Sequence, residues 1–129
     1  MYRTLLILGL LGSAVSMYQT LAFSWNPAFE APALAEGPRH TNYHAFRGFT
    51  LAVGAAGVMA FGMFQPAAGR RRPLWWAMLI AGGCYYAGWW LPWPLLGLRT
   101  PHGIAEIVHV LSASLALGAV ILSRRRFPN

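Results

Sequence analysis

Two of the common charged residue types are missing from this 129-residue chain, which contains no lysine and no aspartate. Its charge comes from ten arginines and three glutamates, and charged residues make up only 10% of the sequence, against roughly 25% in soluble domains. Hydrophobic residues make up 57%. This balance excludes an ordinary soluble domain and indicates a protein that lies in a lipid bilayer.

Cysteine is almost absent. The single Cys84 excludes a disulfide within the chain and a metal site built from several cysteines. Its place in an apolar run indicates a small buried side chain and not a reactive thiol. Nucleic acid is not an expected partner despite the net charge of +7, because the arginines form short clusters between apolar runs.

The abundant hydrophobic residues form four apolar runs. Each run is about as long as a helix that crosses a hydrocarbon core of ~30 Å. They cover residues 4–23, 42–64, 74–91 and 100–123. We interpret the first run as a retained span, because it is longer than the apolar part of a signal peptide. The predicted fold class is an all-α membrane protein, a four-transmembrane-helix bundle that forms a single domain over residues 1–129.

The arginines are divided unequally between the two sides of such a bundle. The amino terminus, the second loop and the carboxyl tail contain Arg3, Arg70, Arg71, Arg72, Arg124, Arg125 and Arg126. The first and third loops contain only Arg39 and Arg99. By the positive-inside rule, both termini are expected in the cytoplasm of a bacterium, with the chain crossing the inner membrane several times.

Small residues recur on one side of the first two runs, which suits close approach of another helix. They are Gly9, Gly12, Ser13 and Ser16 in the first run, and Gly48, Ala52, Ala56 and Ala60 in the second.

The last run begins with an unusual polar stripe. Thr100 and Pro101 are the expected N-cap and first helical residue. His102, Glu106 and His109 then follow at i, i+4 and i+7, on one helix face. Glu106 is the only acid in a long apolar run, and a charge inside a membrane requires a partner. The cheapest partner is Arg47, so we expect an ion pair between the second and fourth spans.

Polar and aromatic side chains of all four spans are expected at the same, outward end of the bundle. This arrangement predicts an outward-facing pocket for a small lipophilic ligand. Glu106 and His109 are the candidate catalytic pair for proton transfer, and Arg47 would orient an anionic or carbonyl group. The candidate ligand-binding residues are His44, Arg47, Tyr85, Tyr86, Trp89, Trp90 and His102.

Several alternatives stay open at this point. The polar groups could only fix one helix to another, and the aromatic residues could form an interface belt. The chain could be an accessory subunit of a larger membrane complex or a homo-oligomer, with the small-residue stripes of the second and fourth runs facing partners. A metal site is another alternative, because His102, Glu106 and His109 have the ligand types of a zinc or iron site; no metal ligand is assigned, because three residues over two turns are stretched for one ion. Haem ligation by His44 and His109 is a further alternative. Whether the protein is an enzyme stays open too.

Two blocks carry a resemblance to a known family. Residues 42–49, NYHAFRGF, lead into the Gly/Ala-rich second run, and a second block extends from Arg99 to the Arg124 cluster. Together they resemble the DoxX-like superfamily of small four-helix bacterial membrane proteins, over most of the chain except residues 24–41. The resemblance implies a four-helix bundle. Some members are tied to sulfur or quinone redox complexes, but this chain has no cysteine pair for such a role.

Overall fold

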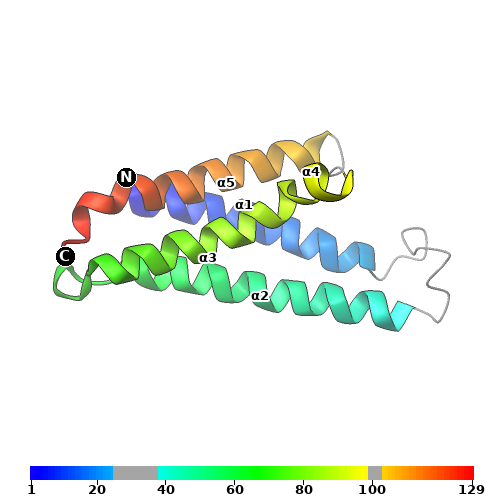
Figure 1. Cartoon of the computed structure of the whole chain (residues 1–129), viewed down its shortest axis with the longest axis horizontal. Helices are drawn as coiled ribbons and strands as arrows, with labels where there is room; N and C mark the ends of the chain where they lie inside the picture. Colours follow the sequence, from blue (N-terminus) through cyan, green and yellow to red (C-terminus); the bar gives the residue numbers. More distant parts are fainter. Residues whose placement is uncertain (25–37, 99–102) are drawn as a thin grey trace.

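The computed structural model describes residues 1–24, 38–98 and 103–129, and every regular element in those ranges is a helix. An all-α fold is therefore confirmed. The long helices run side by side, and both termini lie at the same end (Figure 1). The helices are α1 (Tyr2–Ser24), α2 (Pro38–Phe64), α3 (Arg72–Trp90), α4 (Pro92–Leu96) and α5 (Ile104–Leu122), with 3-10 turns η3 (Ala67–Gly69) and η4 (Ser123–Arg126).

The four long helices of the described residues pack in a ring in which each has two main neighbours. α1 packs against α2 and α5, and α3 packs against the same two helices. α2 and α5 lie at opposite corners and form no comparable interface (Figure 1). The expectation that the second and fourth spans face each other is therefore wrong. In a bundle of consecutive antiparallel helices, the second and fourth are the diagonal pair.

Among the described residues, three helical segments are long and apolar enough to cross a membrane: Tyr2–Ala22, Tyr43–Phe64 and Ile104–Arg126. They indicate a multi-pass membrane protein. Only 28%, 22% and 33% of their apolar windows is buried inside the structure, so most of their surface must face lipid or another chain. α3 is not among them, because four tryptophans and two tyrosines among its 19 residues reduce its mean hydropathy.

The boundaries of the later helices differ in part from expectation. α3 ends at Trp90, before Pro92 as predicted, but the chain then forms the short helix α4 instead of a simple loop. α5 begins at Ile104 after Gly103, whose φ of 88° favours glycine, so the fourth span begins later than residue 100. The expected cap at Thr100 and Pro101 lies outside the described residues.

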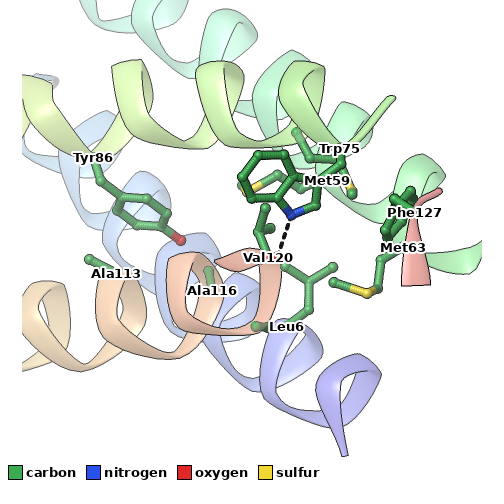
Figure 2. Packing of buried hydrophobic residues seen from close by; sticks show 11 residues of the cluster. Leu6, Met59, Met63, Trp75, Tyr86, Ala113, Ala116, Val120 and Phe127 are labelled. Atoms are coloured by element: carbon green, nitrogen blue, oxygen red, sulfur yellow. Dashed lines mark hydrogen bonds between the residues drawn. The ribbon is translucent and has the colours of Figure 1, made fainter. Parts of the chain in front are cut away.

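The core lies toward the end that carries the termini. Leu6, Met63, Val120 and Phe127 are buried there together, and Figure 2 shows them around the indole of Trp75. The Trp75 Nε1–H donates a hydrogen bond of 2.8 Å to the carbonyl oxygen of Val120. Because Phe127 is only 1% exposed, the carboxyl tail is part of this core.

The α1–α5 interface is made by small residues. A Cβ atom at Gly9 would lie 2.6 Å from the backbone nitrogen of Ala116, and one at Gly12 would overlap the hydroxyl of Ser112. The small-residue side predicted for α1 is therefore confirmed. Such an approach leaves no room for larger side chains between the two backbones.

The α2–α3 interface uses methionine. The sulfur of Met78 lies against Gly62, and the sulfur of Met59 lies against Gly82. Gly82 thus marks the inward side of α3, and Cys84 falls on the other side of the helix, where it is exposed. The prediction that Cys84 is buried is therefore wrong.

Candidate functional site

Two serines of α1 make polar contacts inside the bundle. Ser13 donates a hydrogen bond of 2.9 Å to the carbonyl oxygen of Gly9, one turn earlier in the same helix. The Tyr86 hydroxyl of α3 lies 2.7 Å from the Ser13 Oγ. Since the single hydroxyl proton of Ser13 is used by Gly9, Tyr86 is the donor. This contact satisfies the phenol of a residue that is only 2% exposed.

The second contact places His109 of α5. The Ser16 Oγ lies 3.2 Å from each ring nitrogen of His109, which is 7% exposed. The His109 ring also stacks on the indole of Trp89. The two ring centroids are 3.4 Å apart, and the ring planes are inclined by 32°. Helices α1, α3 and α5 therefore meet at His109 through one hydroxyl group and one indole.

A cavity of about 280 Å³ lies between α1, α2 and α3, away from the termini. Its volume is close to the lower limit of ~300 Å³ for small-molecule pockets. Most of its wall is apolar, and hydroxyl and imidazole groups interrupt that wall. It is lined by Met17, Thr20, His44, Ala45, Gly48, Phe49, Ala52, Tyr85, Gly88 and Trp89.

The cavity exists because the outer half of α2 is loosely packed. A Cβ atom at Gly48, Gly54 or Gly57 would meet nothing within 4 Å. Tyr43 and Phe46, in the first turns of α2, are 61% and 58% exposed. The methionine contacts that hold α2 to α3 occur farther along the helix, at Met59 and beyond.

Three of the predicted ligand-binding residues line this cavity, namely His44, Tyr85 and Trp89. Tyr86 does not line it and points to Ser13 instead. Trp90 is 38% exposed and does not line it either. The alternation follows from the helix, because positions 85, 88 and 89 share a face that positions 86 and 90 leave.

The expected ion pair is not formed. Within the described residues, no hydrogen bond or ion pair joins Arg47 to Glu106, and their helices occupy opposite corners of the bundle. Arg47 is exposed and does not line the cavity. Glu106 lies in the first turn of α5, where the positive end of the helix dipole favours an acid. Glu106 is thus closer to the beginning of its helix than the sequence suggested.

The candidate catalytic pair is not brought together at the cavity. His109 is buried against Ser16 and Trp89, while Glu106 lies three residues earlier and half-buried; neither lines the cavity wall. The third member of the predicted stripe, His102, lies outside the described residues. His109 adjoins the cavity only through Trp89, which both stacks on it and lines the wall.

The arrangement of the described residues does not support the metal and haem alternatives. Across residues 1–24, 38–98 and 103–129, no three His, Cys, Asp or Glu side chains come together. His44 belongs to α2 and His109 to α5, the two helices that do not face each other. A bis-histidine haem requires imidazoles on facing helices.

Several residues of this site were expected only to pack or to lie at the edge of a span. Ser13 and Ser16 were interpreted only as small residues, although their hydroxyl groups fix Tyr86 and His109. Thr20 and Met17, one turn further along α1, complete the cavity wall. A usable signal was present, since serines three residues apart in an apolar helix commonly bond to neighbouring helices.

Comparison with known proteins places no family on this arrangement: no protein-family model, curated protein or solved structure matches the chain. The resemblance to the DoxX-like superfamily stays a prediction from the two sequence blocks.

Proposed function

We propose that this chain is a four-span protein of the bacterial inner membrane that binds a small lipophilic molecule in the cavity between α1, α2 and α3. The observation that carries the proposal is the cavity itself. Its wall combines the apolar side chains of Met17 and Phe49 and the Trp89 indole with a few polar groups from His44 and Tyr85. Apolar walls with a few converging polar groups are typical of small-molecule sites.

The topology is supported by the position of the termini. Three helices meet the length and hydropathy required of a span, and both termini lie at one end of the bundle (Figure 1). An odd number of crossings would put them on opposite sides, so in this proposal α3 crosses the membrane as well. Its tryptophans lie in its first and last turns, at 75–76 and 89–90, as expected for residues at the two membrane interfaces. The arginine clusters at the termini favour the cytoplasmic side for that end.

The proposed activity is binding and not proton transfer. Glu106 and His109, the residues chosen from the sequence for proton transfer, do not line the cavity. In this proposal His109 is a positioning residue: it supports the Trp89 indole through the ring stack and is itself held by Ser16. The polar groups that a ligand would meet are His44, Tyr85 and Thr20.

A cavity-filling variant tests the proposal. Gly48 lies at the centre of the α2 face formed by Ala45, Phe49 and Ala52, and a Cβ atom there would meet nothing. We therefore expect Gly48→Leu to fill the cavity without disturbing the helices. The control is Gly54→Leu, which adds the same side chain to the same helix at a position that is equally open and does not line the cavity.

The measurement is native mass spectrometry of the purified protein, together with chemical analysis of small molecules extracted from it. We expect a bound small molecule on the parent and on Gly54→Leu, and its loss from Gly48→Leu. A parent without any bound molecule, or equal occupancy in both variants, would refute the proposal. Stoichiometric co-purification of other subunits would favour the alternative of an accessory subunit.

A further inference from the structure

A second hollow lies at the opposite end of the bundle, and its chemistry is different. It measures about 600 Å³ and is lined by residues from four elements. Three of the lining residues are arginines, which come from the beginning of α3 and from η4. The lining residues are Tyr2, Arg72, Ile121, Leu122, Arg124 and Arg125.

The carboxyl tail holds these arginines together. The backbone N–H of Arg72 donates a hydrogen bond of 2.8 Å to the carbonyl oxygen of Pro128, and its Nη1 donates one of 3.2 Å to that of Arg124. Phe127, between those two partners, is buried in the core. Arg72 is therefore held beside η4 by two hydrogen bonds to backbone carbonyl oxygens before any ligand arrives.

Two arginines at this end lie against aromatic rings, and no acidic side chain of the described residues lies at this end of the bundle. The guanidinium carbon of Arg124 lies 5.8 Å from the centroid of the Trp75 ring, and that of Arg126 lies 4.9 Å from the centroid of the Tyr2 ring. Glu106 is the only acidic side chain in the part of the chain that the structure describes. About 27 Å of helix separates it from Arg124, since an α-helix rises 1.5 Å per residue.

We propose that this hollow binds a phosphate group, and that the phosphate belongs to the headgroup of an anionic membrane lipid. Guanidinium groups present paired N–H donors that match phosphate oxygens. Basic hollows between membrane helices are suited to lipid headgroups. The two apolar lining residues favour a lipid over a soluble phosphate, because Ile121 and Leu122 are 53% and 56% exposed and can lie along an acyl chain.

Arg125 is the residue to change, because it lines the hollow and makes no hydrogen bond or ring contact with other described residues. Arg125→Gln therefore removes a ligand contact without loosening the fold. The matched control is Arg71→Gln, which removes the same charge from an exposed residue at the same end that does not line the hollow. Arg125→Lys keeps the charge and removes only the paired donors.

The full-length protein in detergent is titrated with short-chain phosphatidylglycerol or phosphatidylcholine, and bound lipid is counted by native mass spectrometry. We expect the parent to bind phosphatidylglycerol more tightly than phosphatidylcholine. Arg125→Gln should bind phosphatidylglycerol about fivefold more weakly, which is the effect of one arginine near a membrane surface. Arg71→Gln should bind as the parent does, and Arg125→Lys should lie between the parent and Arg125→Gln.

Three results would overturn this proposal. Equal weakening by Arg71→Gln and Arg125→Gln would show a diffuse attraction without a site. Equal binding of the two lipids would remove the role of net charge. Displacement of phosphatidylglycerol by millimolar inorganic phosphate would assign the hollow to a soluble anion. In that case phosphate should also raise the melting temperature of the protein as much as phosphatidylglycerol does. None of these results depends on the cavity between α1, α2 and α3. The two proposals can therefore be refuted independently of each other.

Discussion

The indole of Trp89 and the imidazole of His109 lie with their ring centroids 3.4 Å apart, and the same indole forms part of the cavity wall. Ser16 of α1 holds the imidazole. Three helices thus contribute to the position of one wall residue. A change at Ser16, which does not line the cavity, should reach the cavity through His109 and Trp89.

The α1–α5 interface gives the sharpest prediction for stability. Gly9→Ala should destabilise the protein by about 1–3 kcal/mol, because the new methyl group would meet the backbone of Ala116 and force the helices apart. Gly83→Ala is the control, since its Cβ atom meets nothing and alanine favours a helix by up to ~1 kcal/mol. Thermal melting in detergent measures both. A Gly9→Ala protein that melts with the parent would contradict the close approach.

The contact between Ser16 and His109 predicts a smaller loss. Ser16→Ala should reduce the free energy of unfolding by about 0.5–1.5 kcal/mol, the usual range for a polar contact between membrane helices. The control is Ser114→Ala on α5, where the serine is exposed. The total tryptophan fluorescence should change in the first variant only, because Ser16 acts on Trp89 through His109. Unfolding in increasing sodium dodecyl sulfate gives both free energies, and identical values would argue against the contact.

The diagonal placement of α2 and α5 predicts that Arg47 and Glu106 act independently. The single variants Arg47→Gln and Glu106→Gln and the double variant form a mutant cycle. The coupling energy should be within about 0.5 kcal/mol of zero, as for residues without a shared contact. A coupling energy well above that range would restore the ion pair that the sequence suggested.

The indole hydrogen bond in the core is the fourth test. Trp75→Phe keeps an aromatic ring but removes the donor to the Val120 carbonyl oxygen, so it should cost about 1 kcal/mol or more. Trp76→Phe is the matched control, because Trp76 is 50% exposed and next in the chain. Equal melting temperatures for the two variants would mean that the bond contributes nothing.

Sequence patterns predicted the helices well and their neighbours poorly. Long apolar runs specify helices in a membrane, since every backbone group must be bonded within its own segment. The small-residue side of α1 also followed from the sequence, because Gly9 and Gly12 leave room for another backbone. The predicted pairing of Arg47 with Glu106 was wrong. It was chosen because the two charges are opposite, and opposite charge does not tell which helices are neighbours in the bundle.

The candidate site was predicted only in part for a related reason. His44, Tyr85 and Trp89 were expected at a pocket and line the cavity, but Arg47 and Tyr86 were expected there too and do not. Depth along the membrane can be read from the order of residues in each span. The direction of each side chain depends on the rotation of its helix, which is set by contacts such as Ser13 with Tyr86.

The two helix interfaces differ in how easily they can change shape. Backbone atoms and hydroxyl groups meet directly between α1 and α5, so sliding or tilting there would break close contacts at once. Met59 and Met78 meet glycines between α2 and α3, and an unbranched thioether side chain changes its rotamer at low cost. α2 is therefore the helix expected to tilt, and the cavity beside it should adjust to molecules of several sizes while the rest of the bundle stays rigid.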